Sequence, residues 1–320
     1  MLEDYRNALR AGQRATRAAQ ARGQSPYLAV LDDILRGVNI VAQEPLGLVD
    51  IPAESIVGTK TAGRHTAFAP NFMPILEADS EFARKWSNLC DAHLEEGIRY
   101  PITAYEYLNK FYVEEGNKRV SVLKYYEAVK IPGTVTRLVP ERNETLENKI
   151  YYEFLDFYKL SKINYVHFSR LGGYAKLQTL VCKATSESWT DDDRLNFASL
   201  YTMFSQQFYA LGGSALGLTP GDALLVYLAV YRYSDAIEST PAQVRENLSK
   251  LWDEIKILTR PQAVELQLEP ATKQGAEPLL SKLNIFSPRP SELRVVLLHE
   301  HNAQTSAWVR GQDKGRDALL

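Results

Sequence analysis

The hydrophobic pattern of this 320-residue sequence changes its period near residue 147. Before that point, short stretches of alternating apolar and polar residues are mixed with helix-like segments. From there to about residue 260, apolar residues recur at three- and four-residue spacing. Alternation is typical of half-buried strands, whereas the longer spacing is typical of amphipathic helices. The change of period therefore predicts an α+β fold in which a mixed unit is followed by a helical domain.

This division predicts five segments along the chain. They are a helical arm (1–45), an α+β module (46–146), a helical domain (147–260), a linker (261–290) and a single βα unit (291–320). One βα unit cannot form a parallel sheet covered on both faces, so the chain is expected to resemble the front part of a longer protein.

Local patterns predict the individual elements. The arm is expected to contain a second helix at 27–38, and the module to begin with a strand at 46–51. A helix capped by Asp79 or Ser80 is expected to end at Gly97, and a hairpin to turn at residues 109–110. A strand at 131–140 should close the module. The helical domain is expected to contain helices at 146–161, 174–184, 191–212, 220–237 and 240–258.

The composition is that of an ordinary globular protein, with 45% hydrophobic and 24% charged residues. A formal net charge of −2 gives no overall attraction for nucleic acid, so DNA is a disfavoured partner. No apolar stretch is long enough for a membrane span, and no signal-peptide pattern is present. A cytoplasmic location is expected, and Cys90 and Cys182 are expected to be free thiols. The sequence leaves the oligomeric state open.

The stretch YVEEGNKRVSV places a glycine and two cations where a strand passes into a helix. Gly116 permits a sharp turn, and Asn117 is expected to be the N-cap. The first turn of a helix presents free N–H groups and partial positive charge. Lys118 and Arg119 add two full charges there, which is unfavourable unless an anion lies nearby. The alternative is that Arg119 pairs with Glu114, Glu115 or another nearby carboxylate.

The loop VGTKTAGRHTAF is expected to form a second wall of the same pocket. Lys60, Thr61 and Arg64 offer cations and a hydroxyl for a phosphate, although the spacing is not that of a P-loop. The alternative is an extended surface loop with scattered polar residues. Together with Gly116, Asn117, Lys118 and Arg119, these are the predicted nucleotide- or phosphate-binding residues.

The order of these elements resembles the ParB/sulfiredoxin-like fold over about residues 46–140. In that family a helix ending in glycine leads to a proline-containing strand and then to a G-x-x-R turn that opens a helix. Gly97, Pro101, Gly116 and Arg119 stand at those positions here. The resemblance implies a nucleotide ligand, CTP or ATP, with the G-x-x-R turn on its phosphates. Asn117 stands where sulfiredoxin has its catalytic cysteine, so the resemblance does not extend to that chemistry.

The C-terminal stretch VVLLHEHNAQTSAWVRGQDKG resembles the first βα unit of the BMP (PnrA-like) substrate-binding proteins of ABC transporters. That family carries a Phe-Asn-x-Ser-Ala-like segment whose Asn contacts a nucleoside. His301 and Asn302 occupy the corresponding positions, followed by Ser306, Ala307 and Gly311. The resemblance implies nucleoside binding by His301 and Asn302. It also implies that the chain is the N-terminal region of a BMP-like protein without a signal peptide.

The expected function is that of a ligand-binding protein, with a nucleotide or nucleoside as partner. Whether it is an enzyme is left uncertain, because no arrangement of catalytic residues and no metal site is predicted from spacing. Two alternatives stay open: a ParB-like DNA-associated protein or nuclease, and a structural module without a ligand. Aromatic residues in the stretch from 151 to 174 are interpreted as core residues, with base stacking as the alternative.

Overall fold

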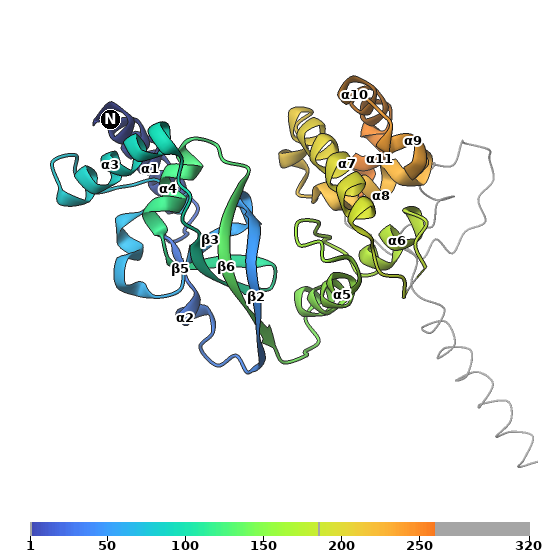
Figure 1. Ribbon diagram of the computed structural model, residues 1–320, viewed down its shortest axis with the longest axis horizontal. Coiled ribbons are helices and arrows are strands. Elements are labelled where there is room, and N and C mark those ends of the chain that lie inside the picture. The colour runs from blue at the N-terminus through green and yellow to red at the C-terminus, as the bar shows by residue number, and fades with distance from the viewer. Residues whose placement is uncertain (1, 185, 260–320) are drawn as a thin grey trace, which may run out of the picture.

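The computed structural model describes residues 2–184 and 186–259. Within them the chain has the predicted α+β character, with a mixed sheet and its helices first and further helices after it (Figure 1). The predicted linker and the βα unit at 291–320, including His301 and Asn302, lie outside the described residues. None of the described helices is both long and apolar enough to cross a membrane.

The sheet has six strands in the spatial order β1-β3-β5-β4-β6-β2. Their bounds are Ala29–Val30 for β1, Ile40–Pro52 for β2, Ile56–Thr59 for β3, Ile102–Tyr107 for β4, Lys110–Glu115 for β5 and Lys130–Pro140 for β6. The β4–β5 and β2–β6 pairs are antiparallel, and the β1–β3, β3–β5 and β4–β6 pairs are parallel. The sheet is therefore mixed. The parallel pair β4–β6 joins two strands that are separated in the sequence by β5 and α4.

The β4–β5 hairpin turns one residue earlier than predicted. Leu108 and Asn109 have φ angles of 50° and 63°, whereas Lys110 already begins β5. The short Asn side chain tolerates left-handed backbone, which explains one turn position. The left-handed backbone of Leu108, the other turn position, is set by the strand pairing that places Tyr107 opposite Lys110.

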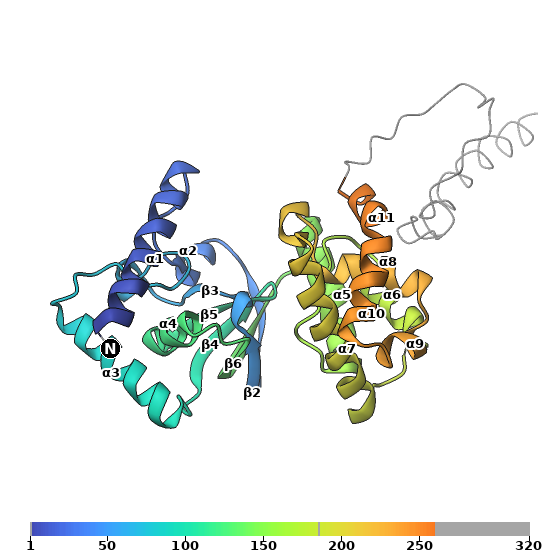
Figure 2. The same ribbon diagram turned by 90° about the horizontal axis from the view of Figure 1, so that it is seen from above.

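Three helices, α1 (Leu2–Ala21), α3 (Glu81–Glu96) and α4 (Asn117–Tyr125), lie together beside the sheet (Figures 1 and 2). Trp86 of α3 is fully buried among them and donates a hydrogen bond from Nε1 to Ser121 Oγ at 2.8 Å. The predicted cap of α3 is confirmed, because the Ser80 side chain accepts from the N–H of Ala83. Val120 and Leu123 of α4 pack on the apolar face of the sheet.

The prediction for the N-terminal arm is wrong beyond its first helix. Residues 27–38 do not form one helix, because Ala29 and Val30 form β1 and only Leu31–Ile34 is helical, as α2. Ala29 pairs with Gly58 of β3, where a Cβ atom would lie 2.3 Å from the Ala29 carbonyl oxygen. β2 also begins at Ile40 and not at residue 46, so the sheet starts inside the predicted arm.

The described residues from 146 to 259 contain helices at the expected places, but two of the expected helices are each divided in two and others end earlier. These helices are α5 (Leu146–Ser161), α6 (Gly173–Leu180), α7 (Asp191–Ala210), α8 (Pro220–Val230), α9 (Tyr233–Ile237), α10 (Pro241–Lys250) and α11 (Trp252–Ile257). The predicted helix at 220–237 is divided by Tyr231, whose backbone is extended, and the one at 240–258 is divided at Leu251. Thr190, Thr219 and Thr240 each form a capping box, so local side chains specify where α7, α8 and α10 begin.

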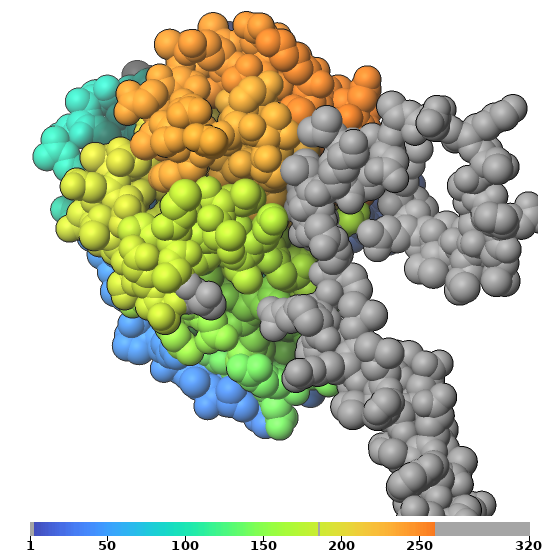
Figure 3. All heavy atoms as spheres, turned by 90° about the vertical axis from the view of Figure 1, so that its right-hand side faces the viewer, coloured from blue at the N-terminus to red at the C-terminus, as the bar shows by residue number. Residues whose placement is uncertain are grey.

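Aromatic side chains form much of the core of this domain. Tyr151, Phe154, Phe157, Phe168 and Tyr174 are all buried, which confirms the core interpretation for these five aromatics of the 151–174 stretch. Tyr152, Tyr158 and Tyr165 are partly buried and pack against the same core. The domain fills the face of the molecule turned toward the viewer in Figure 3, and the blue and teal N-terminal residues are visible only around it. Tyr151 of α5 donates a hydrogen bond to Glu106 of β4 at 3.0 Å, so this aromatic core also reaches the sheet.

Candidate functional site

The turn between β5 and α4 is built around Gly116. Its φ and ψ angles are 110° and 18°, and a Cβ atom there would lie 2.8 Å from Ile102 Cγ2. Gly116 is therefore required both by its backbone conformation and by the space around it. Gly116 is also the N-cap, and the predicted cap Asn117 is instead the first residue of α4.

The amino end of α4 has free backbone donors. The first hydrogen bond of the helix runs from the N–H of Val120 to the carbonyl of Gly116 at 3.0 Å. The N–H groups of residues 117, 118 and 119 consequently have no carbonyl partner within the helix. Such groups, together with the helix dipole, favour an anion at this end of a helix.

Arg119 folds back onto the turn. Its Nη1 donates to the carbonyl oxygens of Tyr100 at 3.0 Å and Pro101 at 2.5 Å, and its Nη2 lies 3.3 Å from Glu115 Oε1. The guanidinium lies against Gly116, where an added Cβ atom would be 3.2 Å from Arg119 Cζ. In this conformation Arg119 links the two residues that precede β4, Tyr100 and Pro101, to the Gly116 turn. A contact between Arg119 and a phosphate stays a prediction.

Asn117 ties the turn to the neighbouring strand. Its Nδ2 donates to Thr59 Oγ1 at 3.1 Å, and that hydroxyl donates to the carbonyl of Val113 at 2.9 Å. The Asn117 Oδ1 atom is buried and accepts no hydrogen bond from the described part of the chain. Asn117 therefore orients the first turn of α4 relative to β3 and retains one unused acceptor.

Lys118 lies among other cations. Its Nζ is 4.9 Å from the centre of the Phe82 ring. Burial lowers the pKa of Lys118, and the positive charges of Arg64 and Lys85 lower it further, while Glu81 opposes them. Lys118 of α4, Arg64 of the short helix η2 (Ala62–Ala67) and Lys85 of α3 thus form a group of cations, in which Lys85 pairs with Glu81 at 2.6 Å. This group is called the α4 cation cluster below.

The other two predicted loop residues lie elsewhere. Lys60 Nζ is 3.8 Å from Asp32 Oδ1, 3.9 Å from Glu114 Oε1 and 5.2 Å from the centre of the Tyr105 ring. Tyr105 packs in a different hydrophobic cluster from the one that contains α4, on the opposite face of the sheet. Thr61 is exposed and begins η2 without a side-chain capping bond. Of the predicted loop residues, only Arg64 is brought to Lys118.

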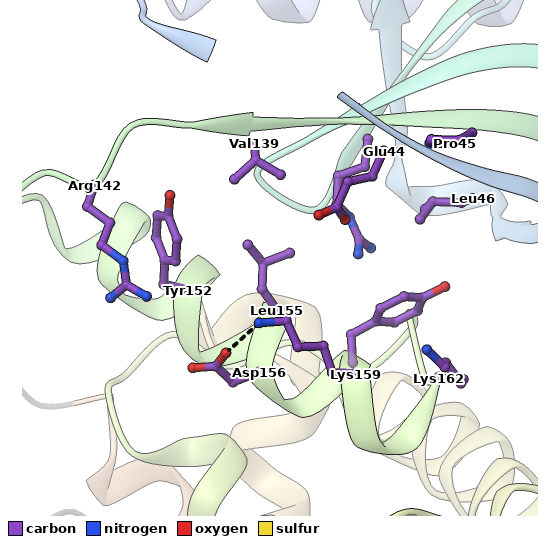
Figure 4. A pocket seen from close by; sticks show the side chains of 12 residues that line it. Glu44, Pro45, Leu46, Val139, Arg142, Tyr152, Leu155, Asp156, Lys159 and Lys162 are labelled. Carbon is purple, nitrogen blue, oxygen red and sulfur yellow. Dashed lines mark hydrogen bonds and ion pairs between the residues drawn. The ribbon is translucent and has the colours of Figure 1, made fainter. Parts of the chain in front are cut away.

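A second cationic region lies between the sheet and α5. It is a cavity of about 570 Å³, within the size range of small-molecule sites. Figure 4 shows strand residues on one side and residues of α5 and its flanking segments on the other. The lining residues are Glu44, Pro45, Leu46, Arg137, Val139, Arg142, Tyr152, Leu155, Asp156, Tyr158, Lys159 and Lys162. This region is called the α5 cavity below.

Arg137 of β6 is the most buried of the charged residues that line this cavity. It is only 2% exposed, and its Nε donates to Glu106 Oε2 at 2.5 Å. Its Cζ lies 4.3 Å from the centre of the Tyr158 ring and 5.2 Å from that of Phe154. Burial raises the pKa of Glu106, and Arg137 opposes that change. The pKa of Arg137 is raised by Glu106 although burial acts against it, so its guanidinium stays charged.

Three more cations line the α5 cavity. Arg142 Cζ lies 4.0 Å from the centre of the Tyr152 ring, and Lys162 Nζ lies 5.5 Å from that of Tyr158. Lys159 Nζ is 3.1 Å from Asp156 Oδ1, and this bond is drawn in Figure 4. With Arg137 the lining carries four cations, against the two carboxylates of Glu44 and Asp156. The lining therefore has an excess of positive charge.

Sequence reasoning missed this cavity, although the strand pattern contained a clue. Ile131, Gly133 and Val135 occupy the buried positions of β6, and Arg137 follows in the same alternation. Glu106 likewise follows Ile102 and Ala104 in β4. A charged residue at an inward position requires a buried partner or a ligand. The β4–β6 register places Glu106 directly opposite Arg137.

No protein-family model matches this chain, and no curated protein is a significant match to it. The resemblances to the ParB/sulfiredoxin-like fold and to the BMP family therefore stay predictions. The geometry of the α4 cation cluster and the α5 cavity is the basis for the two proposals that follow.

Proposed function

We propose that the amino end of α4 binds the phosphate of a small-molecule ligand, with a nucleotide as the ligand class. The observation that carries this proposal is geometric: the N–H groups of residues 117–119 have no carbonyl partner within α4, because the first bond of the helix runs from Val120 to Gly116. Burial lowers the pKa of Lys118, and the charges of Arg64 and Lys85 lower it further, so other cations lie near this helix end. Lys118 and Arg64 repel each other beside this helix end, whereas Lys85 is paired with Glu81 at 2.6 Å. A bound dianion would relieve that repulsion and also accept bonds from the free N–H groups of α4.

The phosphate is held in this proposal by backbone N–H groups and by two side chains. Lys118 and Arg64 approach it as cations, and Asn117 keeps the first turn of α4 oriented through its bond to Thr59. Gly116 allows the ligand to come close to the backbone. Arg119 keeps the turn in shape through its bonds to Tyr100 and Pro101, and it does not contact the ligand in this arrangement.

The finer proposal is that the module is ParB/sulfiredoxin-like and that the nucleotide is CTP or ATP. It is supported by the order of elements, in which α3 ends at Gly97, β4 follows Pro101 and α4 follows the Gly116 turn. In a longer BMP-like protein, nucleotide at this module would be sensed together with a nucleoside bound elsewhere. That coupling predicts that the nucleotide changes the nucleoside affinity of the longer protein.

A structural module without a ligand is the second candidate function. The contacts of Arg119 favour it, because two backbone carbonyls and Glu115 already use its donors. The Arg119–Glu115 pair is not a buried ion pair, however, since the Glu115 side chain is 79% exposed. A purely structural module also leaves Lys118 and Arg64 beside the free N–H groups of α4, with Glu81 paired to Lys85 as the neighbouring carboxylate.

Thermal stability with and without CTP, ATP, GTP and nucleosides tests the proposal. A ligand at about 100 times its Kd should stabilise the wild-type protein by about 2.7 kcal/mol. The double variant Arg64→Ala/Lys118→Ala should lose most of this stabilisation. A matched control, Arg36→Ala/Lys110→Ala, removes two exposed cations that pair with Asp33 and Glu147, and it should respond like wild type.

Two outcomes would contradict the proposal. The first is that no nucleotide stabilises the wild-type protein, which would favour the structural module. The second is that Arg64→Ala/Lys118→Ala is stabilised as much as wild type, which would move the phosphate to another part of the chain.

A further inference from the structure

The hydrogen bonding of the buried ion pair in the α5 cavity is asymmetric. The Glu106 carboxylate accepts from the N–H of Asn109 at 2.7 Å, from Tyr151 OH at 3.0 Å and from Arg137 Nε. Among the described residues, Nε is the only nitrogen of the Arg137 guanidinium that donates to another protein atom. The acid of the pair is therefore satisfied, whereas the terminal nitrogens of the base lie unpaired at the wall of the cavity.

The terminal nitrogens of Arg137 face the open cavity and are not among the buried unpartnered atoms of the described residues, so a ligand or water can complete their bonding there. The guanidinium of Arg137 is planar and is fixed by Glu106 on one edge and by the Tyr158 ring on one face. Its remaining edge can present two parallel N–H donors, which is the geometry that binds phosphate oxygens in bidentate fashion. Lys159 and Lys162 add positive charge at the same cavity.

We infer that the α5 cavity is a second binding site, for a small organic phosphate whose phosphoryl group bonds the free edge of Arg137. The organic part would pack on the apolar and ring surfaces of Leu155, Tyr152 and Tyr158. This site is separate from the α4 cation cluster and does not depend on the function proposed for it. It also joins residues of the sheet to residues of α5, so that its ligand would contact both units.

A nucleic acid does not fit this cavity. Arg137 is 2% exposed, and a backbone phosphate in a polymer would have to bring its neighbouring nucleotides into a space of about 570 Å³. The cavity has the size of a single small molecule. The ligand class is therefore a free phosphate ester.

Isothermal titration calorimetry with adenosine monophosphate, with pyrophosphate and with a short single-stranded oligonucleotide tests the inference on the full chain. The cavity variant is Lys159→Ala/Lys162→Asn, in which Asn suits the left-handed backbone of residue 162, whose φ is 59°. The matched control is Lys149→Ala/Lys256→Ala, which removes exposed lysines paired with Glu144 and Asp253. The cavity variant should bind adenosine monophosphate about tenfold more weakly than wild type or the control.

A second variant tests Arg137 itself. Glu106→Gln/Arg137→Met removes both buried charges together, so that neither is left without its partner. A circular-dichroism melt should show that it folds, and it should lose adenosine monophosphate binding at the cavity. If this variant is unfolded, the cavity variant still decides, because Lys159 and Lys162 are outside the buried pair.

The turn variant Arg64→Ala/Lys118→Ala separates the two sites. Binding that survives in the turn variant and is lost in the cavity variant supports this inference and contradicts the proposed function. Binding that survives only in the cavity variant overturns this inference. Two binding events in wild type, one lost in each variant, support both. Absence of binding, binding of pyrophosphate but not of adenosine monophosphate, or binding of the oligonucleotide alone would each overturn the inference.

Discussion

The α4 cation cluster and the α5 cavity both collect positive charge, but they hold it in different ways. At α4 the cations come from α3, η2 and α4, and the neighbouring carboxylate, Glu81, is exposed and pairs with Lys85 at 2.6 Å. At the cavity the central cation is buried and already bonded to Glu106 on one edge. A surface cluster can lose a charge at small cost to folding, whereas a buried pair cannot. The comparison predicts that removing the charges of Arg64 and Lys118 changes mainly ligand affinity and that removing the charge of Arg137 also lowers stability strongly.

The largest effect is expected for Arg137→Ala. The substitution leaves the Glu106 carboxylate buried without its cation, which destabilises the protein by about 3–5 kcal/mol. Urea unfolding followed by circular dichroism measures this loss. Arg137→Ala combined with Glu106→Gln should recover part of it. A loss below about 1 kcal/mol, the size expected for a surface pair, would show that Arg137 and Glu106 do not behave as a buried ion pair.

Gly116→Ala should produce the next largest effect. It forces a side chain into left-handed backbone and places Cβ 2.8 Å from Ile102 Cγ2, at a cost of about 1–3 kcal/mol. Gly37→Ala is a matched control, because Gly37 has a φ of 79° but open space around its Cβ position. Denaturant unfolding should therefore show a larger loss for Gly116→Ala than for Gly37→Ala. Equal losses would mean that backbone conformation alone requires glycine at the α4 turn.

Arg119→Met distinguishes a structural arginine from a phosphate ligand. It removes the donors to the Tyr100 and Pro101 carbonyls and should cost about 1–2 kcal/mol of stability. Nucleotide affinity should fall less than in Arg64→Ala/Lys118→Ala. Both are measured on the same samples, by urea unfolding and by calorimetry. Unchanged stability with lost binding would instead identify Arg119 as a ligand of the phosphate, as the G-x-x-R resemblance implies.

The smallest effect is a difference in pH dependence between the two sites. Because the pKa of Lys118 is lowered by burial, Arg64 and Lys85, Lys118 loses its proton at a lower pH than an ordinary lysine. Anion binding at α4 should weaken as the pH rises through that pKa, by about fivefold for one lost charge. Arg137 keeps its charge over the same range, because Glu106 raises its pKa although burial opposes this.

Adenosine monophosphate is a suitable probe for this comparison, because the second pKa of a phosphate monoester is about 6. Its affinity for the cavity variant reports on α4, and its affinity for the turn variant reports on the α5 cavity. The two pH profiles should diverge as the pH rises through the lowered pKa of Lys118. Profiles that coincide would contradict the role assigned to Lys118.

Much of the fold followed from local patterns in the sequence. The change of hydrophobic period near residue 147 predicted the helices that follow it, and Ser80 marks a helix start at which its side chain then forms the capping bond. The segment at 27–38 was mistaken for a helix, because its apolar spacing does not reveal that Ala29 pairs with Gly58 in the sheet. In this segment the tertiary pairing of β1 with β3 overrides the local helix propensity.

The distinction between what local sequence patterns determine and what tertiary structure determines also applies to the two cationic regions. The α4 turn was visible in the sequence because Gly116, Asn117, Lys118 and Arg119 are consecutive, and the chemistry of a helix amino end is local. Tertiary structure decided which distant residues join them: Arg64 lies near Lys118, and Lys60 does not.

The α5 cavity depends almost wholly on tertiary structure. Glu106 and Arg137 become neighbours only through the parallel β4–β6 pairing, and α5 then covers them. A strand pattern specifies which face a side chain occupies, but not which strand will lie beside it, because that depends on packing over the whole sheet.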